Sequence, residues 1–288
     1  MDSFYIGHRL TNLIIPGEPD ALTIMTPAGS WELRKDSRYG EYKRAIAEGK
    51  IAETYMVEIS CSYTGSRAAA MDAVDDELVP LCLAASYLTG LSVAPSRSLP
   101  ASQIKFMQVG PHFPRPRAMG TGYPACPDDT SFARTVADFV AAYPTKGMDE
   151  NIRLIAHHFL DALAFWSLED LVLSTTTILE IIAISAKRVA GAQGQTIKHF
   201  TPRLAFAAAR FNLPNLPADF RNMRNDLVHE GTLSGQKFPS KDASACGVAV
   251  AGALDWIDEY VFAAMGLGKP AQPRFIGEAF RGANSFSL

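Results

Sequence analysis

Short stretches in the first third of the chain alternate apolar and polar side chains, which is the period of a β-strand with one buried face. The alternating stretches are LTIM from residue 22, TYMVEISCSY from residue 54 and IKFMQV from residue 104. Between the last two, DDELVPLCLAASYLTG is typical of a helix, with Asp76 as its cap, Pro80 near its first turn and Gly90 at its end. The pattern therefore predicts a helix packed on a sheet.

Beyond residue 128 the apolar positions recur every three to four residues, which is the period of an amphipathic helix. The expected caps are Asp129, Asp149, Ser167 and Thr201, the last followed by Pro202 in the first helical position. The stretch ADFRNMRNDLVHE is expected to end at Gly231, and a last helix to cover residues 242–265. Every segment of this half is thus predicted to be helical.

Seven prolines interrupt the chain between residues 95 and 127, so the boundary between the two halves is expected there or soon after. The predicted fold class is α+β. Residues 1–145 form a mixed α/β N-terminal domain containing β-strands, and residues 146–266 form an all-α helical bundle. Residues 267–288, rich in Gly, Pro, Asn and Ser, are expected to be a loosely ordered tail.

The composition of the 288 residues, 48% of them hydrophobic, allows cores of ordinary size. The longest apolar run, residues 78–94, contains Pro, Ser, Tyr and Thr, which favours a buried helix over a membrane span. The N-terminus lacks the basic and apolar regions of a secretory leader. The four cysteines show no CxxC pair and no histidines at ligand spacing, so we expect reduced thiols in a cytoplasmic protein, with no metal and no cofactor.

Charge is distributed unevenly along the chain, although the net charge of −3 provides no general attraction for nucleic acid. From Lys187 to Asn225 there are seven basic residues and one acidic residue, a balance of +6. From Asp128 to Glu180 there are nine acidic and three basic residues, a balance of −6. Positive charge concentrated in one segment is expected for a protein that contacts phosphates, and a solvated basic face explains it equally well.

The basic segment ends in RNDLVH, residues 224–229. On a helix, Phe220, Met223, Leu227 and Val228 share one apolar face, and Arg224 falls inside it. Asn225 and His229, four residues apart, project from the neighbouring side together with Arg221. A guanidinium in an apolar sector needs a partner, so Arg224 either pairs with an acid such as Glu180, extends to solvent, or binds a ligand.

The residues of this half resemble a known family. RNDLVHEG is similar to the arginine, polar residue, three residues, histidine signature of HEPN domains, in particular the Apea-like branch. The preceding NIRLIAHHFLDALAFWSLEDLVLSTTTILEIIAISAKRVA resembles the two long helices of that branch, including its Leu-Glu pair at Leu179 and Glu180. The final LDWIDEYVFAA is similar to its closing helix, and the resemblance covers residues 147–266.

The resemblance implies an HEPN-like helical bundle that commonly dimerises, and catalytic members are metal-independent endoribonucleases, often toxins or phage-defence effectors. It makes Arg224 and His229 the catalytic candidates, with Asn225 and Glu180 in support. The basic residues expected to contact RNA are Arg221, Lys198, Arg203 and Arg210. Expected partners are RNA, a second copy, and an antitoxin or regulatory protein. The alternatives are a non-catalytic module that binds RNA, nucleotide or protein, and a purely structural helical scaffold.

The implied chemistry suits these residue types. In metal-free RNA cleavage the ribose 2′-hydroxyl attacks the adjacent phosphorus, so a proton must be moved and a charged phosphate stabilised. Histidine titrates near neutral pH, and arginine presents a charged fork to phosphate oxygens. One histidine cannot readily serve as base and acid on opposite sides of the phosphorus, which favours a dimer with facing motifs.

Other polar groups have simpler interpretations. His157 and His158 are adjacent on a helix, point about 100° apart and are expected at a core rim or surface. The acids of DAVDDE, residues 72–77, are expected at a helix start, and those of DWIDE, residues 255–259, on an exposed face. Arg115 and Arg117 are expected to keep a loop solvated.

Overall fold

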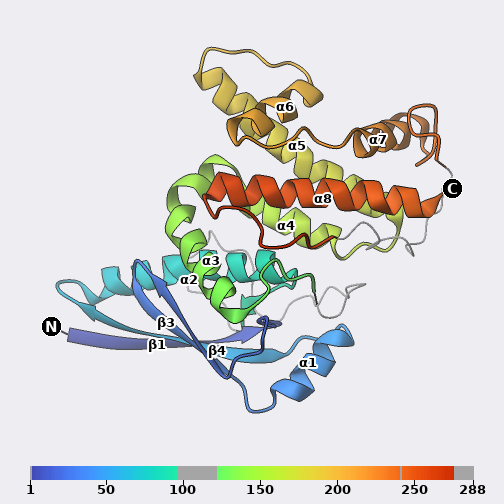
Figure 1. The fold of residues 1–288 in the computed structure, drawn as a ribbon. Helices are drawn as coiled ribbons and strands as arrows, with labels where there is room; N and C mark the ends of the chain where they lie inside the picture. Colours follow the sequence, from blue (N-terminus) through green and yellow to red (C-terminus); the bar gives the residue numbers. More distant parts are fainter. Residues whose placement is uncertain (1, 97–121, 241, 276–288) are drawn as a thin grey trace. The chain divides into compact units, whose positions relative to one another are not determined.

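The structure, a computed structural model, describes residues 2–96, 122–240 and 242–275 (Figure 1). The chain divides into two compact units, Met1–Pro144 and Thr145–Leu288. The first holds an antiparallel sheet with helices and the second is helical, so the mixed class expected from the sequence is observed. Within the described residues, no helix is long and apolar enough to cross a membrane. The expected strand at 104 and the loop arginines Arg115 and Arg117 lie outside the described residues.

The first unit contains a five-stranded sheet in the order β2-β3-β4-β1-β5, with every neighbouring pair antiparallel. The strands are β1 (Asp2–Thr11), β2 (Ala21–Thr26), β3 (Gly29–Lys35), β4 (Glu53–Tyr63) and β5 (Ala94–Pro95). The strands expected at residues 22 and 54 are confirmed as β2 and β4. The sequence interpretation missed β1 and β3, which pair with β4 from its two sides.

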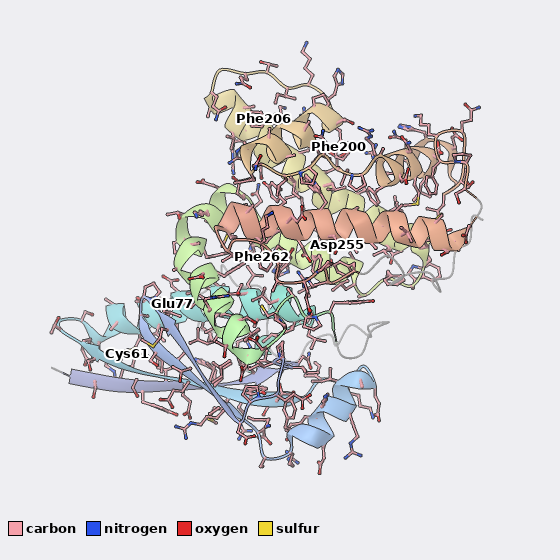
Figure 2. All side chains as sticks on the ribbon, viewed as in Figure 1. Cys61, Glu77, Phe200, Phe206, Asp255 and Phe262 are labelled. Carbon is pink, nitrogen blue, oxygen red and sulfur yellow. The ribbon has the colours of Figure 1, made fainter. Side chains whose placement is uncertain are left out.

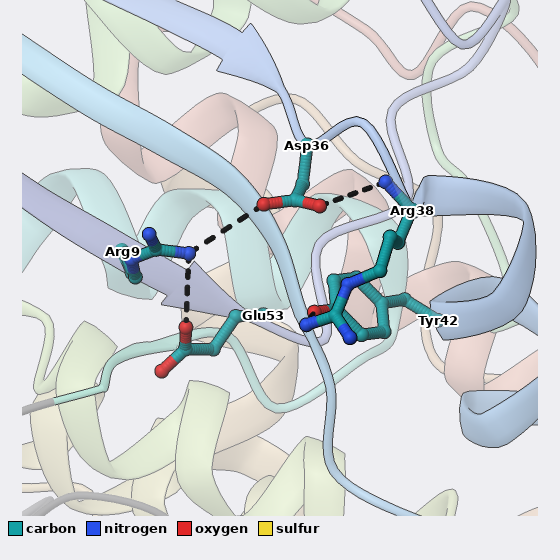
Figure 3. Close-up of polar contacts among 5 residues, drawn as sticks. All are labelled: Arg9, Asp36, Arg38, Tyr42 and Glu53. Atoms are coloured by element: carbon teal, nitrogen blue, oxygen red, sulfur yellow. Dashed lines mark hydrogen bonds and ion pairs between the residues drawn. The ribbon is translucent and has the colours of Figure 1, made fainter.

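The sheet buries one face and exposes the other. Leu33, Val57 and Ile59 are buried, while Tyr5 and Met25 on alternate positions are exposed. On the exposed side Arg9 Nη1 donates to Asp36 Oδ2 at 3.5 Å and to Glu53 Oε2 at 3.4 Å, linking three segments of the sheet (Figure 3). Exposed pairs of this kind contribute little to stability.

The helices of this unit are α1 (Tyr39–Ala47), α2 (Arg67–Thr89) and α3 (Asp129–Ala142). Helix α2 starts much earlier than expected, because Ser66 rather than Asp76 caps it, and Pro80 therefore lies in its interior. Its end at Gly90 is confirmed by a left-handed φ of 70°. Asp128 caps α3, one residue before the expected Asp129, by accepting the Ser131 N–H.

Glu77 joins α2 to the turn between β2 and β3 (Figure 2). Its carboxylate accepts the Ala28 N–H at 2.7 Å and the Trp31 indole N–H at 3.2 Å, and the Thr26 hydroxyl donates to it as well. Carboxylates bonded to several donors in this way are stabilised in a partly buried setting. Glu77 is therefore part of the scaffold of the first unit.

The second unit consists of α4 (Ile152–Ala162), α5 (Leu168–Ala192), α6 (Phe200–Arg210), α7 (Ala218–Glu230) and α8 (Ala243–Met265), with a short π-helical turn η2 (Tyr143–Gly147) following α3. Helix α5 contacts α4, α6, α7 and α8. It is therefore the central element of the bundle, and it places Glu180 among the other helices.

Several expected helix ends are confirmed in this unit. Ser167 accepts the Asp170 N–H at 3.1 Å, and Gly231 and Gly266 end α7 and α8 with left-handed φ values. Two caps were wrong. Asn151, not Asp149, precedes α4, and its amide donates to Ser185 Oγ on α5; His199, not Thr201, precedes α6.

The acids of DWIDE are not on an exposed face. Asp258 is 2% exposed and receives two bonds from Arg274, at 2.7 Å from Nε and 2.6 Å from Nη2. Phe275 is also buried, and its N–H donates to Asp255 Oδ1 at 3.3 Å. The described start of the expected loose tail is thus packed on α8, because the buried Asp258 carboxylate requires a cation.

Candidate functional site

Helix α7 carries the RNDLVH segment, and its buried face differs from the expected one. The buried residues are Phe220, Met223 and Asp226, whereas Val228 is 45% exposed. The apolar pattern predicted that Val228 shares the buried face with Phe220 and Met223. Asp226 is buried instead, so the buried face is rotated and Arg224 lies at its edge.

Arg224 contacts residues from three helices. Its Nη2 donates to Glu180 Oε1 on α5 at 3.1 Å, and its Nη1 donates to the neighbouring Asn225 Oδ1 at 3.3 Å. Its Cζ lies 5.0 Å from the ring centre of Phe200, the first residue of α6. Figure 2 shows Phe200 at this end of α6. The pairing with Glu180 that the sequence offered as one explanation is present.

The Arg224 guanidinium keeps unused binding capacity. Its side chain is 18% exposed, and among the described residues its Nε is buried without a hydrogen-bond partner. Glu180 is 41% exposed, so the pair is open to solvent on the carboxylate side. A partly buried arginine fixed by an acid, an amide and an aromatic ring is preorganised to bind an anion in a defined position.

His229 lies in the last turn of α7, immediately before Glu230 and the terminating Gly231. It is exposed, and no hydrogen bond or ion pair of its imidazole occurs among the described residues. It follows Asn225 by one helical turn, so Asn225 connects Arg224 to the surface that carries His229. The imidazole is accessible from solvent.

Asp226, inside the RNDLVH segment, organises the loop after α7. Its Oδ2 accepts the Phe238 N–H at 2.7 Å and the Lys237 N–H at 3.0 Å, and the residue is 0% exposed. A Cβ on Gly235 would lie 2.7 Å from Asp226 Cγ, so the loop passes too closely for a larger residue. The loop is therefore folded back onto Asp226 of α7.

The basic residues expected to bind RNA fall into two groups. Lys198 is exposed and Arg221 is half-buried, so both remain accessible. Arg203 donates to the carbonyls of Ile197 and Lys198, and Arg210 Nη2 donates to the buried Glu150 at 2.7 Å. Tyr260 also donates to Glu150. Arg203 therefore fixes the loop before α6, and Arg210 joins α6 to Glu150 just before α4.

Sequence reasoning did not single out Asp226, His199, Phe200 or Lys237. The contacts of Asp226 with Phe238 and of Phe200 with Arg224 join separate segments, for which the local pattern carries no signal. The described residues contain no group of three or more His, Cys, Asp or Glu side chains arranged to hold a metal ion.

No family model, curated protein or solved structure matches this chain. The HEPN resemblance therefore rests on the residues of the chain alone.

Proposed function

We propose that the helical unit is a metal-independent endoribonuclease of the HEPN type. The observation that carries the proposal is the contact between Arg224 and Glu180. The resemblance names these two residues on separate helices, 44 positions apart in sequence. Their side chains meet, and an exposed histidine, His229, lies five residues after the arginine on the same helix.

In this proposal Arg224 binds the scissile phosphate. Glu180 and Asn225 orient the guanidinium, and a phosphate reaches it from the solvent side of the Glu180 pair. His229 moves a proton during attack of the 2′-hydroxyl on phosphorus, which releases the 5′-oxygen and leaves a 2′,3′-cyclic phosphate. General acid–base catalysis of this kind contributes about 10²- to 10⁴-fold to rate.

The protein is further proposed to act as a homodimer through the helical unit. Ile184 on α5 is 57% exposed and Val228 on α7 is 45% exposed. Each lies one helical turn beyond a member of the Arg224–Glu180 pair, so apolar surface borders the polar site. Exposed apolar surface with a polar rim is typical of protein contact sites. The exposed Met148 lies outside both helices.

The dimer is tested by light scattering at tens of micromolar protein. Ile184→Glu is expected to convert dimer to monomer, because a charge would be buried between the copies. Met148→Glu is the matched control and is expected to leave the dimer intact. A wild-type protein that stays monomeric at this concentration contradicts this part of the proposal.

A non-catalytic RNA-binding module is the second candidate. The observation in its favour is that the described contacts of Arg224 are with Glu180, Asn225 and Phe200, and none of them joins it to His229. Binding without turnover requires Arg224 and not His229. The two candidates therefore differ in the effect of removing the histidine.

The deciding experiment incubates purified protein with end-labelled RNA in EDTA. Cleavage is expected to leave 2′,3′-cyclic phosphate ends, and a 2′-deoxyribose at the cut position is expected to block it. His229→Ala should abolish cleavage and preserve RNA affinity, whereas Arg224→Ala should impair both. His158→Ala, a half-buried histidine on α4, is the control. RNA binding without cleavage under any condition supports the second candidate, and cleavage that EDTA abolishes refutes the mechanism.

A further inference from the structure

Cleavage by attack of the 2′-hydroxyl on phosphorus needs two proton transfers, one from the 2′-oxygen and one to the 5′-oxygen. His229 can carry out one of them. Four histidines lie in the described part of the helical unit: His157, His158, His199 and His229. The first two are half-buried on α4, and His199 and His229 are the exposed ones. His199 is therefore the one other exposed histidine in the described part of this unit.

His199 is held close to Arg224 through its neighbour. It directly precedes Phe200, whose ring centre lies 5.0 Å from Arg224 Cζ. Consecutive Cα atoms are about 3.8 Å apart. The cation–π contact therefore brings the start of α6, which His199 directly precedes, to the helix that carries Arg224.

The segment that carries His199 is fixed from behind. Arg203 Nε donates to the Ile197 carbonyl at 3.0 Å, and its Nη2 donates to the Lys198 carbonyl at 2.9 Å. The Arg203 N–H donates to the His199 carbonyl at 3.2 Å. The imidazole itself makes no cap bond to α6, so its backbone is fixed while its ring is free to meet a ligand.

The chemistry of the surroundings also suits an RNA substrate. From Lys187 to Ala218 the chain contains basic residues and no Asp or Glu. No acid of this segment competes with a phosphodiester for the His199 imidazole. Lys198, directly before it, is exposed and adds positive charge.

We infer, on the basis of the proposed function, that His199 is a second catalytic residue of the same site, supplied by the same chain as Arg224 and His229. One histidine accepts the proton of the attacking 2′-hydroxyl. The other donates a proton to the 5′-oxygen as its bond to phosphorus breaks. One bond to phosphorus, P–O2′, forms while another, P–O5′, breaks. At the end the first histidine carries the proton that it took from the 2′-hydroxyl, and the second has lost the proton that it gave to the 5′-oxygen.

The first test compares His199→Ala with Lys198→Ala in the full-length protein. His199→Ala is expected to lower kcat for RNA cleavage about 10²- to 10⁴-fold with unchanged RNA affinity. Lys198→Ala, in the same loop, is expected to raise KM and leave kcat nearly unchanged. Imidazole added to the His199→Ala protein should restore part of the rate, which a merely structural role would not allow. A His199→Ala protein as active as wild type overturns the inference and leaves the proposed function standing.

A second test uses a uridine 3′-(4-nitrophenyl phosphate), whose leaving group departs without a proton. With this substrate one of His199→Ala and His229→Ala, and not the other, should regain most of its activity, because the two residues have opposite roles. An equal loss of activity in both variants on both substrates refutes the assignment of opposite proton-transfer roles.

A third test mixes the two variants. The mixture should show no activity, since each protomer lacks one histidine. Recovery on mixing refutes a site built within one chain. Absence of cleavage by wild type is a failure of the proposed function instead.

Discussion

Replacing Asp226 should destabilise the helical unit although this residue lies inside the candidate motif. Its carboxylate accepts the N–H groups of Lys237 and Phe238 from a 0% exposed position. Each charge-assisted bond contributes about 1.5–3 kcal/mol, and a buried N–H left unpaired costs about 1–3 kcal/mol. Desolvation of the carboxylate offsets part of this sum. We expect a loss of about 4 kcal/mol for Asp226→Ala and about 2 kcal/mol for Asp226→Asn, which retains one acceptor oxygen.

Urea denaturation followed by far-UV circular dichroism measures the loss, and amide exchange locates it. The amides of Lys237 and Phe238 should exchange faster in Asp226→Asn, because they lose a charged acceptor. Asp219→Asn, an exposed acid in the first turn of the same helix, is the control and should change stability by less than about 1 kcal/mol. At low temperature Asp226→Asn should still cleave RNA, unlike His229→Ala. A loss below about 1 kcal/mol for Asp226→Ala would falsify the argument that this carboxylate holds the loop.

The remaining predictions concern the α8 ion pair, pH and salt. Arg274→Ala removes both Arg274 bonds to the Asp258 carboxylate, which is 2% exposed, and should cost about 3–5 kcal/mol in thermal unfolding. Arg274→Met combined with Asp258→Leu should recover most of this loss. Burial raises the pKa of Asp255 from 3.8 to about 6, so the folded state favours the protonated carboxyl. The stability that this protonated group contributes is fully present below pH 3.8 and is lost as pH rises through about 6. Asp255→Asn keeps an acceptor for the Phe275 N–H. It should stabilise the protein by about 1 kcal/mol at pH 8, after solvent screening, and give no gain at pH 3.5. Equal changes in stability at the two pH values contradict this prediction. RNA affinity should fall steeply as the salt concentration rises. Lys198→Ala should reduce the slope of log affinity against log salt concentration by about 1. An unchanged slope would show that Lys198 does not contact the RNA.

The features that the sequence determined by itself are those set by neighbouring residues. Gly90 and Gly231 end their helices because a left-handed φ is easy for glycine, and a glycine after a periodic segment is readable locally. The strands at residues 22 and 54 were readable from β-branched and aromatic residues that alternate with polar ones. The division into a β-containing part and a helical part follows from the spacing of apolar residues, which changes from every second residue to every third or fourth.

The tertiary structure decided what depends on distant partners. The apolar pattern could not show that Asp226 is buried, because its two N–H donors belong to a loop more than ten positions away. It could not choose among the fates open to Arg224, since Glu180 lies 44 positions away and Phe200 begins another helix. The pattern placed Asp258 at the surface. Asp258 is buried because Arg274, from outside α8, neutralises its carboxylate. In each case burial of a polar group is favourable only once a partner is brought to it, and the packing of separate segments determines that partner.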